Sequence, residues 1–275
     1  MAKKEQDTQK LSSIEDRILK DYGDGILVSG TYITEQKETI VQISPQIDTM
    51  LGGGIKFGSF VIKSGKPKMG KTSLSLNIGA KALQIPNTFD IPRKFYILSI
   101  EGRLQPRDLY GIVDLRPFLK DQVVIINSKP GKILNAEDYL DIGEQLINEQ
   151  PGSIFLFDSF SQLCSKGRRE ETIGRRFRDD VPLMLADFCK RVSNVIPINQ
   201  SIVIGITHVI ANQGATMPGQ SPWMEASGQK IQYALDVKMK ATYAQPWKSG
   251  EKQVGLDIHW DCSASPLGPP STKCI

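Results

Sequence analysis

Residues 60–83 read FVIKSGKPKMGKTSLSLNIGAKAL, and this stretch decides the fold. An apolar strand is predicted over residues 60–62, and a helix over residues 71–83. The residues between them fit the pattern G-x-x-x-x-G-K-[ST]. Because a strand precedes this loop and a helix follows it, the stretch predicts a phosphate-binding loop.

The chemistry of phosphate binding explains the residue types in this loop. Its glycines let backbone N–H groups turn toward an anionic phosphate at the N-terminus of a helix. Lys71 can reach the β and γ phosphates of a nucleotide, and the Thr72 hydroxyl can bind Mg²⁺. The predicted nucleotide-binding residues here are Gly65, Lys66, Pro67, Lys68, Met69, Gly70, Lys71, Thr72 and Ser73.

Strands and helices alternate through the next part of the chain. Further strands are predicted over residues 95–100, 123–126, 154–157 and 201–206, and helices over residues 106–113, 136–149 and 179–194. The strands are nearly all apolar, which is typical of parallel strands covered on both faces. We therefore expect a doubly wound α/β domain with a mostly parallel sheet. Two later strands, over residues 234–239 and 254–260, predict an antiparallel hairpin at one edge.

The N-terminal region precedes this alternation. A helix is predicted from Ser12 to Asp21, a short strand over residues 26–28, and a polar connection over residues 30–39. A strand over residues 40–43 and a short helix from Pro45 then lead to the phosphate loop. We divide the chain into residues 1–38 and residues 39–275.

Composition excludes several classes of protein. Hydrophobic residues make up 40% of the 275 and charged residues 23%, which excludes a disordered or collagen-like chain. The apolar runs are too short to span a membrane, and the N-terminus lacks the apolar core of a signal peptide. The four cysteines form no Cys-x-x-Cys pair, so we expect reduced thiols in a cytoplasmic protein without membrane attachment.

Positive charge is concentrated in one segment. The net charge is only +4, but residues 166–178 hold six basic and two acidic residues. The basic residues are Lys166, Arg168, Arg169, Arg175, Arg176 and Arg178. A charge run of this kind is usually a solvated surface, so by itself it does not establish contact with phosphate.

Three polar side chains follow apolar strands. Asp158 ends one strand and is expected beside the phosphate loop, where its carboxylate can hold the water shell of Mg²⁺. Glu101 ends another and can polarise a water molecule for attack on the γ-phosphate. His208 follows a third, where a polar group can sense the γ-phosphate and transmit that state.

Read together, these segments resemble the RecA recombinase family over about residues 12–275. Residues 14–30 look like the bacterial RecA N-terminal helix and strand, and residues 43–58 look like its lead-in to the phosphate loop. Glu101 and Asp158 fall where the family has its catalytic Glu and its metal-side Asp. Thr207-His208 falls where cellular RecA has Asn-Gln, and a His there is found in phage recombinases of the UvsX type.

The resemblance implies cofactors, partners and further site residues. It implies ATP and Mg²⁺, with Glu101, Lys71 and His208 as catalytic residues and Thr72 and Asp158 at the metal. It implies that residues 1–38 pack on a neighbouring protomer, and that residues 165–178 and 210–226 are DNA-binding loops. Besides the six basic residues above, the implied DNA-binding residues are Trp223, Met224 and Gly228; Trp223 and Met224 can wedge between bases.

The chain also departs from the family pattern. The family's late lysines, which act on the neighbouring nucleotide, are absent near residues 258–262, and Lys230, Lys238 and Lys273 are equally placed to replace them. Asp108 stands where the family has its adenine-stacking Tyr, with Arg107 beside it as a nucleotide-binding residue. The sequence stops where RecA would begin its C-terminal domain, so we expect a core without it.

The leading hypothesis is an ATP- and DNA-dependent recombinase in a bacterial or phage-infected cell. It would form a filament on single-stranded DNA and promote pairing and strand exchange with double-stranded DNA. One alternative is a ring-forming helicase of the DnaB class, which residues 69–72 and 99–101 also resemble. The other is a single-strand binding or annealing protein with weak ATPase activity, which the absent lysines favour.

Overall fold

The computed structural model describes residues 14–35, 37–172, 180–211, 223–225, 231, 234–268 and 272–274. For residues 211, 223–225 and 272–274 it describes the main chain alone. The chain divides into two compact units, Met1–Glu38 and Thr39–Ile275. Within the described ranges, no helix is long and apolar enough to cross a membrane.

The first unit differs from its predicted secondary structure. Residues 14–22 are helical as expected, but residues 26–28 form no strand. A strand needs a hydrogen-bonding neighbour, and the described part of this unit contains none. The predicted polar connection is also wrong at its start, where α2 spans Gly30–Glu35. The Ser29 hydroxyl accepts a hydrogen bond from the Tyr32 N–H at 3.1 Å, which caps this short helix.

The second unit contains the predicted alternation of strands and helices. Its strands are β1 (Ile40–Val41), β2 (Ile55–Lys56), β3 (Ser59–Gly65), β4 (Phe95–Ser99), β5 (Val123–Ile126), β6 (Ile154–Asp158), β7 (Ile202–Ala211), β8 (Trp223–Glu225), β9 (Val237–Ser249), β10 (Lys252–Ala264) and β11 (Thr272–Cys274). Its helices are α3 (Pro45–Leu51), α4 (Lys71–Leu83), α5 (Pro106–Gly111), α6 (Ala136–Glu149), α7 (Lys166–Glu170), α8 (Val181–Val192) and α9 (Val195–Ile198), with 3₁₀ helices at Val113–Phe118 and Phe160–Gln162.

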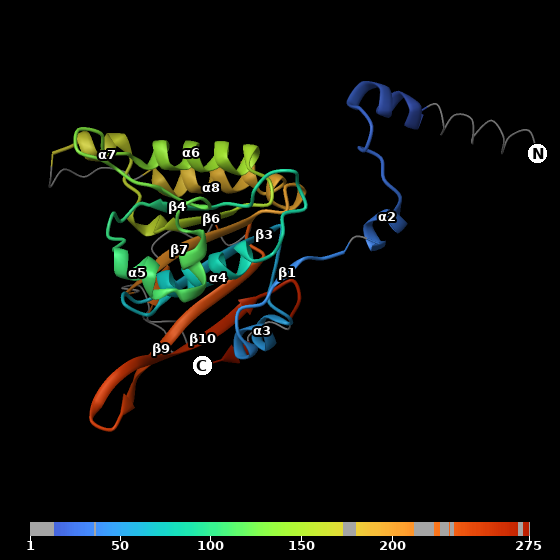
Figure 1. The fold of residues 1–275 in the computed structure, drawn as a ribbon. Coiled ribbons are helices and arrows are strands. Elements are labelled where there is room, and N and C mark those ends of the chain that lie inside the picture. The colour runs from blue at the N-terminus through green and yellow to red at the C-terminus, as the bar shows by residue number, and fades with distance from the viewer. Residues whose placement is uncertain are drawn as a thin grey trace, which may run out of the picture. The chain divides into compact units, whose positions relative to one another are not determined.

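The main sheet is mostly parallel, as predicted. Its strand order is β11-β10-β9-β3-β7-β6-β4-β5, and β8 pairs with β7 off this path. The strands from β9 to β5 run parallel, whereas β10 and β11 are antiparallel and close one edge. Helices α4 and α5 cover one face of the sheet and α6 and α8 the other (Figure 1). The expected fold class, an α/β core with an antiparallel edge, is confirmed.

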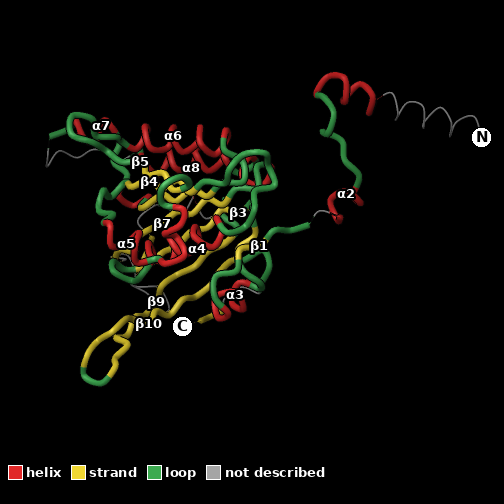
Figure 2. The backbone as a smooth tube through the Cα atoms, in the orientation of Figure 1, coloured by secondary structure: helices red, strands yellow, loops and turns green. Residues whose placement is uncertain are grey.

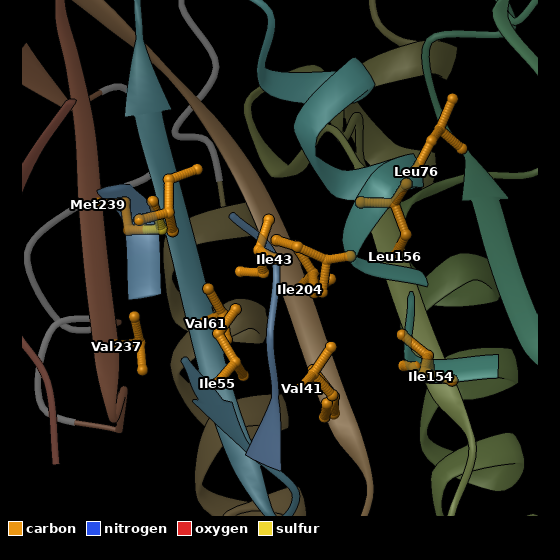
Figure 3. Close-up of a cluster of buried hydrophobic side chains, with 14 of the residues drawn as sticks. Val41, Ile43, Ile55, Val61, Leu76, Ile154, Leu156, Ile204, Val237 and Met239 are labelled. Atoms are coloured by element: carbon orange, nitrogen blue, oxygen red, sulfur yellow. The ribbon is translucent and has the colours of Figure 1, made fainter. Parts of the chain in front are cut away.

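Two apolar clusters hold the helices on the sheet. Alternate residues of β6 point to opposite faces, so Leu156 joins the cluster beneath α4 and Phe157 the cluster beneath α6 and α8. Figure 3 shows part of the first cluster, in which Leu76 of α4 and Ile204 of β7 lie with Leu156. The inner strands β3, β4, β6 and β7 are therefore buried on both faces, which explains why they read as continuous apolar runs.

The β9–β10 hairpin is longer than predicted. Each strand has 13 residues, and the two pair from Ser249 and Lys252 at the turn to Lys238 and Ala264. Only the first part of β9, residues 237–241, pairs with β3. The rest of the hairpin extends away from the sheet (Figure 2). Sequence alternation is weak in this arm because much of it is exposed on both sides.

A tight contact in the sheet gives a stability prediction. A methyl group added at Gly205 of β7 would overlap the Phe160 ring and lie 2.7 Å from Ile62 Cδ1. We expect Gly205→Ala to lower the free energy of unfolding by about 1–3 kcal/mol, because a packed core resists added volume. Urea denaturation measures this. Gly111→Ala is the matched control, since nothing lies within 4 Å of its added carbon; equal stability of both variants would contradict the prediction.

Candidate nucleotide-binding and catalytic site

The phosphate loop joins β3 to α4 at the carboxyl end of the parallel strands. Gly70 adopts a left-handed conformation, with φ at 61°, and an added carbon there would lie 2.6 Å from Ile258 Cδ1. The Lys71 ammonium donates hydrogen bonds to the carbonyl oxygens of Gly65 at 2.9 Å and Lys66 at 2.6 Å. Burial lowers the pKa of Lys71, while the carboxylates of Asp158 and Glu101 oppose that shift. The loop thus encloses a positively charged side chain at the N-terminus of a helix.

Thr72 and Asp158 meet beside this loop. The Thr72 hydroxyl donates a 2.8 Å hydrogen bond to Asp158 Oδ2, which brings the start of α4 against the end of β6. Burial raises the pKa of Asp158, and the hydrogen bond from Thr72 opposes that shift. A hydroxyl and a carboxylate are oxygen ligands of the kind Mg²⁺ prefers, so these two residues fit the metal that the sequence predicts.

Glu101, Ser159 and His208 form a second cluster next to Asp158. The Ser159 hydroxyl donates to Glu101 Oε1 at 2.8 Å, and His208 Nε2 lies 2.8 Å from the same oxygen. The hydrogen bond to His208 is the main cause that holds the pKa of Glu101 below its ordinary value. Main-chain contacts fix the cluster, because Glu101 N–H donates to the Asp158 carbonyl and His208 N–H donates to Ser161 Oγ. The lowered pKa favours the ionised carboxylate and the two hydrogen bonds orient it, as a general base requires.

These groups face one large cleft of about 1140 Å³. Its lining includes residues 67–74 and Asn77 of the loop and α4, together with Glu101, Arg103, Ile112, Asp158, Ile206 and His208. It also includes the β10 residues Gln253, Val254, Gly255, Leu256, Ile258 and Trp260. A phosphate loop, two carboxylates and a partly apolar wall suit a nucleotide.

Most of the predicted nucleotide-binding residues meet in this cleft. Gly65 and Lys66 take part through their carbonyl oxygens, which accept from Lys71. Arg107 does not line the cleft; it is exposed on α5, and its role stays a prediction. The wall formed by β10 was not predicted, and neither were Arg103 and the contact of Ser159 with Glu101. Ser159 directly follows Asp158 in the sequence, but its contact with Glu101 depends on the pairing of β4 with β6.

The structure describes only part of the predicted DNA-binding set. Lys166, Arg168 and Arg169 lie exposed on α7, after Ser165, whose hydroxyl accepts from the Arg168 N–H. The backbone of Trp223 and Met224 belongs to β8, which pairs with β7 so that Met224 lies opposite Ile210. Arg175, Arg176, Arg178 and Gly228 lie outside the described residues, as does Lys230 among the candidates for action on a neighbouring nucleotide.

The sheet order and the phosphate loop define the class: an α/β core of the P-loop NTPase type. No family model matches the chain. It is 24% identical over 267 residues to Protein RecA of Xanthomonas campestris pv. campestris (strain B100), covering 96% of this chain and 74% of that protein. It is also 24% identical over 268 residues to Protein RecA of Xylella fastidiosa (strain M12), covering 96% and 73%. These matches support a RecA-like family, and the fold is consistent with a RecA-like core.

The Glu101–His208 contact predicts a pH effect. We expect His208→Ala to raise the pKa of Glu101, because the hydrogen bond that lowers it is removed. A base acts only when ionised, so the acid limb of the ATP turnover profile should move to higher pH. The measurement is kcat/KM for ATP across that limb in both proteins. A limb at the same pH in the variant would show that His208 does not control the ionisation of Glu101.

Proposed function

We propose that this protein is a DNA-dependent ATPase that forms filaments on single-stranded DNA and promotes homologous pairing and strand exchange. Similarity to RecA supports a RecA-like recombinase or related NTPase. The observation that carries the finer proposal is the position of His208: it contacts Glu101 in the cleft and lies on the same strand, β7, that pairs with β8. Strand β7 therefore carries both the side chain that contacts the predicted base, Glu101, and the residues that pair with β8 in the predicted second DNA loop.

The proposed hydrolysis uses the cleft residues in separate roles. Lys71 and the loop N–H groups bind the phosphates, and Thr72 and Asp158 would hold Mg²⁺. Bound Mg²⁺ neutralises charge that develops on the phosphate oxygens. Glu101 accepts a proton from the attacking water, with its carboxylate oriented by Ser159 and His208. This arrangement supports ATP hydrolysis to ADP and phosphate.

His208 would couple the state of the nucleotide to DNA. It lies level with Gly65 at the start of the phosphate loop and three residues before Ala211, the last residue of β7. A γ-phosphate that displaces the His208 ring would change the position of residues 209–211 and of β8, which pairs with them. ATP would then favour DNA binding and hydrolysis would weaken it. Lys166, Arg168 and Arg169 on α7 would add contacts to DNA phosphates.

Self-assembly is proposed through the first unit. Its described residues leave large apolar side chains exposed, namely Ile14, Tyr22, Ile26, Leu27, Val28, Tyr32 and Ile33. The β5 strand, at one end of the main sheet, exposes Ile125. We propose that residues 26–28 of one copy extend along β5 of the next, which would bury apolar surface on both and supply the missing strand partner. Repetition of this contact would give a filament in the cytoplasm of a bacterial or phage-infected cell.

ATP turnover with and without single-stranded DNA, at fixed salt, tests the function. We expect DNA to stimulate turnover, and ATP with Mg²⁺ to increase retention of DNA in a gel shift. A Leu27→Asp variant should keep nucleotide binding but lose assembly, as light scattering would detect. Equal ATP turnover with and without single-stranded DNA would contradict the proposed DNA-dependent ATPase activity. Closed rings in electron micrographs, in place of filaments, would contradict the recombinase and favour a helicase.

A further inference from the structure

Arg103 is a basic residue of the cleft that has no part in the hydrolysis proposed so far. It lies in the connection between β4 and α5, two residues after Glu101. Gly102 has a left-handed backbone, with φ at 62°, and its N–H donates to the Ser99 carbonyl at 3.2 Å, which turns the chain after β4. On the other side, Leu104 packs against the apolar cluster beneath α4. Arg103 is therefore held between two fixed residues, next to the predicted base.

The guanidinium of Arg103 carries a charge that no described residue neutralises. The residue lines the same cleft as the phosphate loop and Glu101, and its side chain is exposed. Among the described residues it forms no hydrogen bond or ion pair. An arginine side chain is not deprotonated in proteins, and its planar fork of N–H donors matches a phosphate group. Arg103 is accordingly a permanent positive charge with donors suited to a bound anion.

The electrostatics of the site place Arg103 on the Glu101 side of the cleft. The hydrogen bond to His208 is the main cause that lowers the pKa of Glu101, and the charge of Arg103 adds to this effect. Among the described residues, the charges that shift the pKa of Asp158 and of Lys71 do not include Arg103. Arg103 therefore acts near the predicted base, on the side away from the predicted metal ligands.

Few basic side chains line the cleft. Among its described lining residues they are Lys68, Lys71 and Arg103, and the first two belong to the phosphate loop. The lining residues of β10 are uncharged. Because the attacked phosphate lies next to the water that Glu101 activates, a cation beside Glu101 is placed to meet it. Arg103 is the lining residue outside the loop that provides such a cation.

We propose that Arg103 binds the γ-phosphate of ATP in the cleft of its own chain and stabilises the charge of the transition state. The inference rests on the proposed ATP hydrolysis. In that reaction the water oxygen bonds to the γ-phosphorus, and the bond from this phosphorus to the oxygen of ADP breaks. Glu101 takes the proton of the water, and ADP leaves with the electron pair. Negative charge is spread over the γ-phosphate oxygens during this step, where a guanidinium can bind it. Hydrolysis would then need no cation from a neighbouring chain.

The test measures ATP turnover and ATP binding in the wild-type chain and in Arg103→Gln. The substitution should lower kcat by about 100-fold, the effect of removing one donor to charge that develops in a transition state. The affinity for ATP, measured by equilibrium dialysis, should stay within about threefold. Arg103→Lys keeps the charge without the planar fork and should recover part of the loss. Arg191→Gln is the matched control, because Arg191 pairs with Glu144 at 3.0 Å on the face of the sheet away from the cleft; its kcat should be unchanged.

A pH profile separates this role from a role in positioning the base. If Arg103 only lowered the pKa of Glu101, Arg103→Gln would move the acid limb of the kcat profile to higher pH and would still reach the wild-type plateau. A contact made in the transition state lowers the plateau itself. A lower plateau with ATP affinity retained supports the proposal. A plateau equal to that of the wild-type chain, or a loss of ATP affinity as large as the loss of kcat, overturns it.

Mixed assemblies test whether Arg103 acts within its own chain. Arg103→Gln and Glu101→Gln chains are mixed on single-stranded DNA, and their joint ATP turnover is measured. If both residues serve the same cleft, every cleft in the mixture lacks one of them, so turnover should stay as low as in the separate variants. Recovery toward the wild-type rate would mean that Arg103 serves a neighbouring chain, and would overturn the proposal. If the wild-type chain does not hydrolyse ATP, the proposed function itself is wrong, whereas an active wild-type chain with an equally active Arg103→Gln refutes this inference alone.

Discussion

Glu101→Gln should lower kcat for ATP hydrolysis by about 10²- to 10⁴-fold, the range that a positioned general base contributes. The substitution is nearly isosteric. A glutamine Oε1 can still accept the hydrogen bonds that Ser159 and His208 make with this oxygen at 2.8 Å. What it loses is the ability to take a proton from water. The affinity for ATP, measured by dialysis, should stay within about threefold, because the residue acts in the transition state and not in binding.

Glu144→Gln is the matched control for this variant. Glu144 lies on α6 and forms an ion pair with Arg191 at 3.0 Å, on the face of the sheet away from the cleft. The Glu144→Gln substitution replaces a carboxylate by an amide, as Glu101→Gln does, and should leave ATP turnover unchanged. If Glu101→Gln turns over ATP as fast as the wild-type chain, Glu101 is not the base. If it loses ATP binding as well, the residue belongs to the binding surface and the assigned role is wrong.

The sequence predicts the elements of the fold correctly where local patterns determine them. The helix over residues 71–83 and the strand over residues 123–126 have the predicted bounds, because apolar periodicity and flanking turn residues mark them directly. The strand predicted over residues 26–28 is wrong because its formation depends on a contact that is not local in the sequence. Its apolar residues carry the pattern of a strand, but pairing depends on a neighbour that a single chain need not supply.

The same distinction applies to the site. Gly70, Lys71 and Thr72 are predicted because a phosphate imposes their types and spacing, and Asp158 is predicted because it ends an apolar strand expected beside the loop. The wall of the cleft on β10 was not, because its residues lie about 180 positions after the phosphate loop and face it only through the pairing of β9 with β3. Contacts made through sheet register leave little local signal in the sequence.

Lys71→Met should weaken ATP binding about 100-fold or more, since hydrogen bonds from a charged donor each contribute about 1.5–3 kcal/mol. The side chain has an exposed fraction of 5%, so water cannot replace the lost ammonium. The substitution also removes the hydrogen bonds to the Gly65 and Lys66 carbonyls, and with them the shape of the loop around the phosphates. Titration of a fluorescent ATP analogue gives the dissociation constants.

Lys68→Met provides the control within the same loop. Lys68 lines the cleft as Lys71 does, but its side chain is exposed, and an exposed charge is screened by water and salt. We expect its removal to weaken ATP binding by only about threefold. Equal losses in the two variants would mean that the loop attracts nucleotide through its total charge. A large loss confined to Lys71→Met would mean that one buried ammonium, held by two carbonyl oxygens, recognises the phosphates.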